Sequence, residues 1–406
     1  MIGKIIRARP KYLTEKLILN TINGNHLRNI KNSENELFFG SGRSALKFFL
    51  IVYKRYINKE NLNILMQSFN CSVVMQASLE AGCYAKICDI KLDDFSIDYN
   101  YLNKIKKKPD ILILTHYQGI PNLQYFEIAD FCKKNSIFLI DDISQTEGSS
   151  INGIKIGSLS DVSLKSFGFD KPISCFKGGS LCIDKLVDKN LKNYILKEYK
   201  KIPTESRKSE LIDLRTLHFL LSFTQKNYYN KKLNNYELLK LIIHYSKSNN
   251  MVYRIMKLDI FSKLYHLEKK IEGKIINKSN IININKLNSL KISLIKKQRD
   301  NYKYDYSIID SLEQYLKKIG IKIDKHDNID MHWNRYSLLD KNNELKKLFE
   351  KMNIEVGNYN WPKGLHDLYH NNSKVIINDR TNYNNTIIAN KYILNIPIWE
   401  NFYGKK

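Results

Sequence analysis

The first 185 residues alternate between short apolar runs and segments of helical length, and this alternation restricts the folds open to the chain. Short apolar runs end at polar or turn residues at Asn63–Met66, Ala85–Ile90, Ile111–Thr115, Ile137–Asp141 and Ser180–Ile183. Helix-length segments lie between several of them, at Ser44–Ile57, Ser72–Ala81 and Leu123–Lys134. This order predicts a largely parallel sheet that is covered on both faces. Ligands of such sheets bind beyond the carboxyl ends of the strands, so we expect the functional residues in the turns that follow them.

The rest of the chain follows other patterns. Apolar residues recur at helical spacing within residues 186–275, which predicts an extended helical segment: Leu211, Leu214, Leu217, Leu221, Phe223, Leu238, Leu239, Ile242 and Ile243. Residues 286–316 predict one long helix with lysines on its exposed face. A small α+β domain is predicted from Ile319–Ile323, Trp333–Leu339, Asn343–Lys351 and Ile354–Val356. We therefore expect a large domain over residues 1–285 and a small C-terminal domain over residues 286–406.

Length and composition exclude several classes of protein. The chain has 406 residues, of which 43% are hydrophobic. This is enough for a large core and a second, smaller one, since single cores stop growing near ~250–300 residues. The apolar runs are far shorter than the ~20 residues that a membrane span needs, and the first residues lack the apolar stretch of a signal peptide. These features predict a cytoplasmic protein. Because the six cysteines lack CxxC spacing, we expect buried free thiols rather than a metal site or a disulfide framework.

The formal net charge of +25 is concentrated in one part of the chain. Residues 185–300 carry 26 Lys and Arg against 10 Asp and Glu. A charge excess confined to one lysine-rich segment favours a solvated surface over a nucleic-acid partner. Attraction for a nucleotide, a phosphorylated substrate or an anionic membrane face stays open. For residues 186–275, an amphipathic helix on a membrane surface is also open, beside packing against the main domain or a second subunit.

Two turns at the predicted sheet edge carry residues suited to charged ligands. Gly40-Ser41-Gly42-Arg43-Ser44 precedes an amphipathic run, and such a helix start directs free backbone N–H groups at one point, which suits a phosphate. The same residues would also serve as a simple helix cap. The apolar strand Ile137–Ile140 ends at Asp141 and Asp142. A carboxylate at this edge can hold a protonated ring nitrogen or cap the next turn.

Lys171 is the candidate nucleophile. It lies among aromatic and small residues in Ser166-Phe167-Gly168-Phe169-Asp170-Lys171-Pro172. Burial lowers the pKa of a lysine and makes its amine nucleophilic toward carbonyl groups. By itself it would be interpreted as an exposed loop lysine, because the chain has 66 basic residues, but its position relative to the other motifs favours the nucleophile. Lys177-Gly178-Gly179-Ser180 then predicts a tight turn that enters the strand Leu181–Ile183.

The order and spacing of these motifs resemble the fold-type I pyridoxal phosphate (PLP) enzymes, and above all the DegT/StrS-type sugar aminotransferases. The N-terminal motifs are Ser41-Gly42-Arg43, Ser68-Phe69-Asn70-Cys71, His116-Tyr117-Gln118-Gly119-Ile120-Pro121 and Asp141-Asp142-Ile143-Ser144-Gln145. They continue with Gly157-Ser158-Leu159-Ser160-Asp161, Ser166-Phe167, Lys171, Gly178-Gly179, Leu365-His366 and Tyr392–Ile398. The resemblance covers roughly residues 35–185 and, less completely, 330–400. It implies an α/β fold with a mostly parallel seven-stranded sheet between helices, plus a small C-terminal α+β domain.

The resemblance also implies roles for single residues. Lys171 corresponds to the lysine that holds PLP as a Schiff base and shuttles the proton, and Asp142 to the acid that pairs with the pyridine nitrogen. Gln145 corresponds to the residue near the phenolic oxygen of PLP. The phosphate cup would consist of the Ser166 hydroxyl and the backbone N–H groups of Gly42 and Arg43.

The chain departs from the family pattern at three places. Arg43 replaces a threonine of the cup, and its guanidinium is bulkier, although it can bind a phosphate bidentately. Cys71 falls where an aromatic side chain normally stacks on the cofactor ring. The motif that supplies an asparagine to the partner subunit's phosphate is not legible, and the nearest candidates are Asn283 and Asn285.

The function implied by the resemblance is a PLP-dependent aminotransferase. It would move an amino group from a donor such as glutamate to a nucleotide-linked keto-sugar for a surface glycan. It would work as a homodimer with active sites at the interface. A transaminase of a non-sugar or phosphorylated small ketone stays open, as does a non-catalytic binding protein with this fold. A sugar dehydratase of the same fold is disfavoured because Lys171 is present.

Overall fold

The computed structural model describes residues 13–24, 35–229, 282–321, 328–352, 356–357, 361–377 and 383–398. The predicted helix around Leu238 and Ile243 lies outside these residues, as do residues 354 and 355 of one predicted strand.

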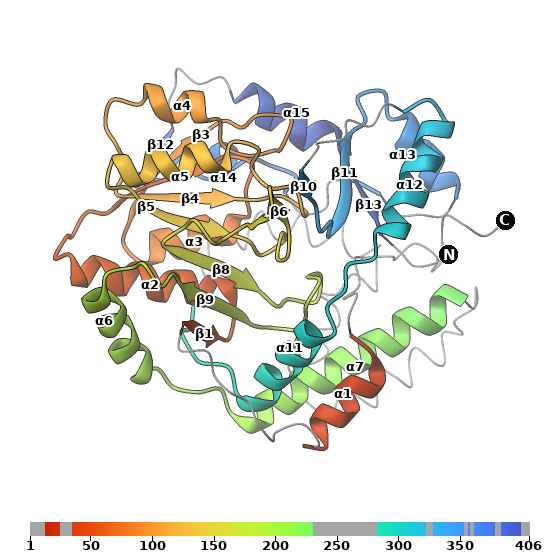
Figure 1. Cartoon of the computed structure of the whole chain (residues 1–406), viewed down its shortest axis with the longest axis horizontal. Coiled ribbons are helices and arrows are strands. Elements are labelled where there is room, and N and C mark those ends of the chain that lie inside the picture. The colour runs from red at the N-terminus through yellow and green to blue at the C-terminus, as the bar shows by residue number, and fades with distance from the viewer. Residues whose placement is uncertain are drawn as a thin grey trace.

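The centre of the molecule is an eight-stranded sheet with the order β1-β9-β8-β5-β4-β2-β3-β12 (Figure 1). The strands are β1 Glu36–Phe39, β2 Asn63–Gln67, β3 Tyr84–Cys88, β4 Ile111–Thr115, β5 Phe138–Asp142, β8 Val162–Ser166, β9 Gly179–Ile183 and β12 Val375–Ile377. From β12 to β8 all neighbours are parallel, whereas β9 is antiparallel to both β8 and β1. The mostly parallel sheet predicted from the sequence is therefore confirmed.

The sheet has eight strands rather than the seven expected, because a C-terminal segment joins it. Strand β12 lies parallel to β3 along Tyr84–Cys88, with Val375 opposite Ala85. It has three residues, too few to show the alternation that identifies a strand in sequence. The chain after residue 286 thus contributes both to the central sheet and to a separate C-terminal layer.

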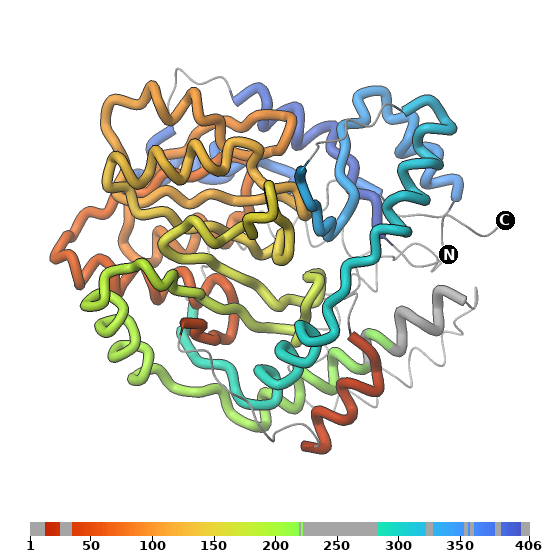
Figure 2. Tube along the Cα trace, viewed as in Figure 1, coloured from red at the N-terminus to blue at the C-terminus, as the bar shows by residue number. Residues whose placement is uncertain are grey.

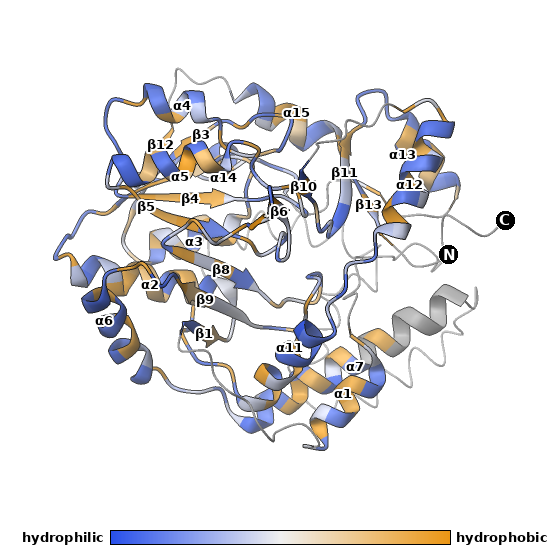
Figure 3. Ribbon diagram, in the orientation of Figure 1, coloured by the Kyte–Doolittle hydropathy of each residue, from blue (hydrophilic) through white to orange (hydrophobic). Residues whose placement is uncertain are grey.

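Helices cover both faces of the sheet. Helices α2 Gly42–Tyr56, α3 Ser72–Glu80 and α6 Lys189–Lys200 lie on one face, and α4 Tyr99–Lys104 and α5 Tyr125–Lys134 on the other (Figure 1). Successive strand residues point to opposite faces. Ile111 and Ile113 therefore join the core under α2, while Leu112 and Leu114 join the core under α5. Figure 3 shows apolar residues concentrated in the strands and on the helix faces turned toward them.

The C-terminal region forms a second, smaller core. Strand β11 Arg335–Leu339 pairs antiparallel with β13 Ile393–Pro397, and helices α12 Tyr306–Lys318 and α13 Glu344–Lys351 share one apolar cluster with them. Helices α14 Leu365–Leu368 and α15 Asn384–Tyr392 complete this part of the chain. Strand β10 Ile329–Asp330 pairs with β6 Ser150–Ile151, which pairs with β7 Ile154–Lys155. Figure 2 shows the segment of β10 beside the earlier segment that carries β6 and β7. The boundary at residue 286 stays a prediction.

Three helices pack together below the edge of the sheet near β1: α1 Glu15–Ile22, α7 Arg207–Tyr229 and α11 Ser289–Asp300 (Figure 1). The predicted single helix over residues 286–316 is wrong, because α11 ends at Asp300 and α12 begins at Tyr306. Asn301 ends α11, and the Asp305 carboxylate accepts a hydrogen bond from the N–H of Ser307 at the start of α12. Local caps thus override a continuous helical pattern.

One lysine of this predicted helix is buried rather than exposed. The Nζ atom of Lys291 lies 2.8 Å from Glu205 and 2.8 Å from Asp213, and the side chain is 1% exposed. Burial alone would lower the pKa of this ammonium, but Asp213 and Glu205 raise it to about 12. Part of the basic excess therefore holds α11 against α7.

A second charge cluster joins α11 to the edge of the sheet. Arg299 donates hydrogen bonds of 2.8 and 3.0 Å to Glu36 in β1 and one of 2.9 Å to Glu147. Lys165 in β8 lies 3.2 Å from the same Glu147 carboxylate. Burial raises the pKa of Glu36, but Arg299 and Lys165 outweigh it and lower this pKa from 4.5 to about 2.

No helix in the described part of the chain has the length and apolar character to cross a membrane. Within the same residues, no group of three or more His, Cys, Asp or Glu side chains is arranged to hold a metal ion. All six cysteines are free, as predicted, and four of them are buried, while Cys71 and Cys182 are partly exposed.

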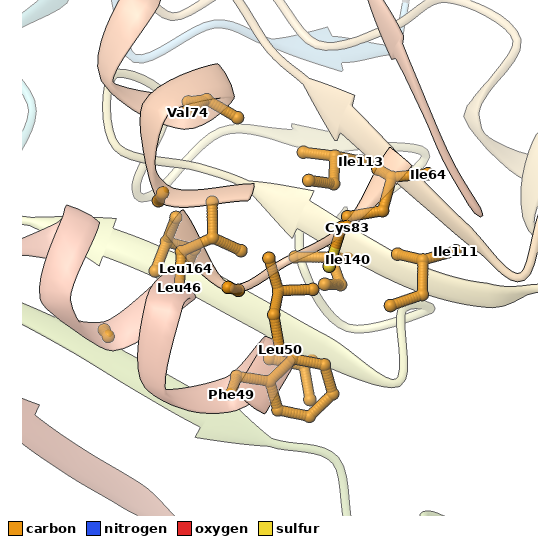
Figure 4. Packing of buried hydrophobic residues seen from close by; sticks show 14 of the residues in the cluster. Leu46, Phe49, Leu50, Ile64, Val74, Cys83, Ile111, Ile113, Ile140 and Leu164 are labelled. Carbon is orange, nitrogen blue, oxygen red and sulfur yellow. The ribbon is translucent and has the colours of Figure 1, made fainter. Parts of the chain in front are cut away.

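Leu50 tests how much the core under α2 contributes to stability. Its side chain is fully buried, against Ile140 and the other strand residues drawn in Figure 4. We expect Leu50→Ala to lower the free energy of unfolding by about 2–5 kcal/mol, measured by urea denaturation. Leu186→Ala is the matched control, because Leu186 is 88% exposed. Equal losses in both variants would contradict this assignment of the core.

Glu36 tests the charge cluster through its pH dependence. Because the pKa of Glu36 is lower in the folded state, its contribution is present above pH 4.5 and is lost as the pH falls toward about 2. The change in pKa corresponds to about 3 kcal/mol. We expect Glu36→Gln to lose stability at neutral pH, with a difference from wild type that shrinks as the pH falls. Urea denaturation from neutral to acid pH measures it, and a difference independent of pH would refute the account. Exposed Glu127→Gln is the control.

Candidate active site

Helix α2 begins in direct contact with the turn between β8 and β9. A Cβ atom added to Gly179 would lie 2.2 Å from the Gly42 nitrogen, and one added to Gly42 would lie 3.1 Å from the carbonyl oxygen of Lys165. Only glycine at these positions lets the two backbones approach so closely. The start of α2 therefore lies beside Ser166, the last residue of β8, whose Cβ atom is 3.5 Å from the Cβ position of Gly42.

The first turn of α2 is capped by serine. The Ser41 hydroxyl accepts a hydrogen bond of 3.1 Å from the N–H of Ser44. Residues 282–287 run alongside, since the Ser44 hydroxyl donates to the Asn283 carbonyl and the Gly40 N–H donates to the Asn285 carbonyl. The first N–H groups of a helix have no partner within it, so this turn is suited to an anion.

Asp142 ends β5 at the same edge of the sheet. Its side chain is buried, with 6% of the residue exposed, and one carboxylate oxygen accepts a hydrogen bond of 3.1 Å from the N–H of Ser144. Its carbonyl accepts a hydrogen bond from the N–H of His116, which follows the neighbouring strand β4. The carboxylate is thus held in place at the point where the strands end.

Lys171 lies in the loop between β8 and β9. Gln298 of α11 holds this loop through two hydrogen bonds to Ser174. It accepts one of 3.0 Å from the Ser174 N–H and donates one of 2.8 Å to the Ser174 carbonyl. Phe167 and Ile173 bury their side chains against the same helix. The Lys171 side chain itself is 13% exposed, and its Nζ atom is 3.3 Å from Asp170.

Cys71 lies at the start of α3, within reach of the charges of Asp142 and Lys171. The side chain of Asn70 positions it, accepting a hydrogen bond of 2.7 Å from the Cys71 N–H and donating one of 3.0 Å to Thr115 at the end of β4. Burial raises the pKa of the Cys71 thiol, and the charges of Lys171, Asp142 and Arg43 also act on it. Lys171, Asp142 and Arg43, from three other turns, are therefore all within electrostatic reach of the Cys71 thiol.

The remaining predicted residues surround this group. Gln145 follows Asp142 within the next turn, and its side-chain oxygen accepts a hydrogen bond of 3.2 Å from the N–H of Gln118. Arg43 lies in the first turn of α2 with its side chain exposed. Of the residues expected to form the phosphate cup, Gly42 and Ser166 lie side by side, whereas the Arg43 side chain is exposed.

Sequence reasoning missed three residues next to the site. Asp170 pairs with Lys171 and was visible in the motif as its direct neighbour. Arg335, buried at the start of β11, acts on the charge of Asp170. Tyr369 donates a hydrogen bond of 3.2 Å to the Ser72 carbonyl and packs on the same apolar cluster as Cys71. Arg335 and Tyr369 both come from distant parts of the chain. Tyr369 follows shortly after the Leu365-His366 motif, whereas no local signal points to Arg335.

Comparison with known proteins agrees with the sequence motifs. The family model of the DegT/DnrJ/EryC1/StrS aminotransferase family matches residues 26–197. The resemblance identified from the motifs is confirmed over these residues. They include Gly42, Cys71, Asp142 and Lys171.

One curated relative matches part of the chain. A UDP-4-amino-4,6-dideoxy-N-acetyl-beta-L-altrosamine transaminase from Campylobacter jejuni subsp. jejuni serotype O:23/36 (strain 81-176) is 33% identical over 141 residues. The match covers 34% of this chain and 37% of that relative. This chain thus matches little more than a third of the relative's length.

Solved structures match nearly the whole chain. A DegT DnrJ EryC1 StrS aminotransferase from Brucella abortus has a TM-score of 0.60 at 14% identity, covering 95% of this chain and 90% of that chain. The E. coli GDP-4-keto-6-deoxy-D-mannose-3-dehydratase with bound hydrated PLP has a TM-score of 0.61 at 14% identity, covering 97% and 96%. These likenesses confirm the predicted fold.

Gly179 tests the contact that places the start of α2. We expect Gly179→Ala to destabilise the protein by about 1–3 kcal/mol, because the new methyl group meets backbone that has to move. Gly168→Ala is the matched control, since its added Cβ meets only the flexible end of the Asp170 side chain, at 3.2 Å. Thermal denaturation compares the two variants, and a Gly179→Ala protein as stable as the control would rule out this tight contact.

Proposed function

We propose that this chain is a PLP-dependent aminotransferase. It would transfer an amino group from an amino acid, with glutamate as the expected donor, to a nucleotide-linked keto-sugar for a surface glycan. The observation that carries the proposal is the convergence of Lys171, Asp142 and Cys71 at one edge of the sheet. A nucleophilic amine and a buried carboxylate from separate strand ends are what carbonyl chemistry on PLP requires.

The residues at this edge fit the chemical groups of PLP. The glycine-lined start of α2 and the Ser166 hydroxyl suit its phosphate. The Asp142 carboxylate suits its ring nitrogen, and the mostly buried amine of Lys171 suits its aldehyde. Bound there, PLP would act as an electron sink for the carbon that carries the amino group.

Each side chain would then have a defined task. Lys171 would hold the cofactor through its amine and, once released by the donor, carry a proton at Nζ. Asp142 would keep the ring nitrogen protonated through a charge-assisted hydrogen bond. Gln145, oriented by the N–H of Gln118, would lie near the phenolic oxygen. Gly42 and Arg43 would bind the phosphate through their backbone N–H groups. The Arg43 side chain is exposed.

The substrate class is supported by the relative's name. The Campylobacter relative is named as a transaminase of a UDP-linked amino sugar, and it is 33% identical to this chain over 141 residues. A nucleotide-linked keto-sugar is therefore the acceptor we propose. The homodimer, the cytoplasmic location and the glutamate donor stay predictions, for which sedimentation equilibrium, cell fractionation and a donor screen are the measurements.

Lys171 provides the direct test. Purified wild type should develop a visible absorption band on addition of PLP, and borohydride reduction followed by peptide mass mapping should place the cofactor on Lys171. Lys171→Ala should lose the band, because the variant lacks the amine that would bind the aldehyde of PLP. Lys177→Ala is the matched control: this lysine lies in the same loop, is 40% exposed and pairs with Asp213. It should keep the band.

The substrates follow from the same preparation. Glutamate should bleach the band, and a nucleotide-linked keto-sugar should restore it. If only small or phosphorylated ketones restore the band, they replace the nucleotide-linked keto-sugar as the proposed acceptor. No band at saturating PLP would refute the enzyme assignment and favour a non-catalytic binding protein with this fold.

A further inference from the structure

We propose that Asn334 is a positioning residue for Gln145. Acting through Gln118, it holds the side-chain amide of Gln145 so that the amide nitrogen is left to donate a hydrogen bond to an oxygen atom of a bound ligand. The inference deepens the proposed function, on which the identity of that ligand rests. With PLP as the ligand, the accepting atom would be its phenolic oxygen.

One hydrogen bond decides which end of the Gln145 amide faces the protein. The backbone N–H of Gln118 donates to the Gln145 side-chain oxygen at 3.2 Å. An N–H group pairs with the oxygen of an amide and not with its nitrogen, so the nitrogen lies on the other side of the group. Within the part of the chain that the structure describes, no residue accepts a hydrogen bond from this nitrogen. Its two N–H donors are therefore available to a ligand.

Gln118 presents its N–H from a backbone conformation that needs support. Its φ angle is 53°, in the left-handed region that a residue with a side chain rarely adopts. Such a conformation persists only where the surrounding structure holds it. Because Gln118 is fully buried, protein groups rather than solvent have to provide that support.

Asn334 provides two of the hydrogen bonds that hold Gln118. Its backbone N–H donates to the Gln118 carbonyl, and its side-chain nitrogen donates to the Gln118 side-chain oxygen, each at 2.9 Å. Asn334 is itself buried and directly precedes β11. The C-terminal layer thus binds the main chain and the side chain of Gln118 together. A lost side-chain bond would leave a buried polar atom without a partner, which is costly.

Neighbouring contacts hold Asn334 opposite Gln118 without using its side chain. A Cβ atom added to Gly119 would lie 2.5 Å from the His332 carbonyl oxygen, so the two segments meet backbone to backbone. The Ser149 hydroxyl accepts a hydrogen bond from the His332 N–H and donates one to the Gly119 carbonyl, both of 2.9 Å. Removing the Asn334 amide should therefore loosen Gln118 while the two segments stay together.

A fixed amide discriminates between ligands. Donors held in one direction favour a ligand that offers an accepting oxygen, because a ligand that offers another donor would place two N–H or O–H groups against each other. If the amide of Gln145 were free to turn, either its oxygen or its nitrogen could face the ligand. The role of Asn334 is to remove this second orientation.

Hydrogen exchange of the full cofactor-free chain tests the link from Asn334 to Gln118. The reporter is the Gln118 backbone N–H, because its protection depends on the bond to Gln145. Mass spectrometry of overlapping peptides around Gln118 gives its exchange rate. Asn334→Ala should raise this rate about fivefold, as expected for one lost hydrogen bond. An unchanged rate overturns the proposal.

Binding of two probes tests the step from Gln145 to the ligand. Equilibrium dialysis measures the dissociation constants of PLP and of the PLP analogue in which hydrogen replaces the phenolic oxygen. Asn334→Ala should weaken the binding of PLP about fivefold and leave the binding of the analogue unchanged. Equal weakening for both probes would indicate a general structural effect and would contradict the positioning role.

Thr386→Val is the matched control. Thr386 is fully buried in α15, and its hydroxyl donates a hydrogen bond of 2.7 Å to Asp89. The control loses one buried hydrogen bond in the C-terminal part of the chain and should leave the exchange of Gln118 and both dissociation constants unchanged. If circular dichroism shows that Asn334→Ala does not fold, Asn334→Ser is the second variant, with the same expected changes.

The two proposals fail separately. A wild type that binds neither probe refutes the proposed function, while faster exchange of the Gln118 N–H in Asn334→Ala still supports the positioning of Gln145 by Asn334. Binding of PLP that is equally tight in wild type and in Asn334→Ala overturns the role of Asn334 and leaves the proposed function intact.

Discussion

The contact between Gly42 and Gly179 is the constraint on which the arrangement of the site depends. A Cβ atom added to Gly179 would lie only 2.2 Å from the Gly42 nitrogen, so the start of β9 and the start of α2 are packed backbone to backbone. The positive end of the α2 dipole is thereby fixed at the end of β8, beside Ser166. The loop that carries Lys171 leaves β8 at the same point. One steric restriction thus places the first turn of α2 and the loop with Lys171 next to each other.

Buried charges attach the surrounding helices to this centre. The positive charge of residues 185–300 was expected mainly on a solvated surface, yet Lys291 and Arg299 are engaged in ion pairs inside the molecule. Arg299 links α11 to β1 and to the segment after Gln145, and Gln298 of the same helix holds the lysine loop. Removing one partner of such a pair leaves an uncompensated charge. The positioning of Lys171 is therefore coupled to α11, which is distant in sequence.

The carboxylates at the site illustrate how similar residues receive different tasks. Asp142 is buried at a strand end and oriented by a backbone N–H, which suits it to hold a cation. Asp170 is partly exposed and pairs with Lys171, and the charges of Lys171 and Arg335 lower the pKa of its carboxyl against the effect of burial. This pKa thus depends on a neighbour in the same loop and on a guanidinium from the C-terminal layer. A sequence motif contains the first of these elements but carries no information about the second.

The sequence by itself determined the elements with strong local periodicity: the parallel strands β2, β4 and β5, helices α2 and α5, and the motifs that follow the strand ends. Each of these follows from residues close in the chain, so that local pattern and structure agree. Only the tertiary structure decided that β12 joins the sheet and that the charge of Arg335 acts on Asp170. Pairings between distant segments depend on which surfaces remain free after the core has formed, and a three-residue strand carries too little local signal to reveal that outcome.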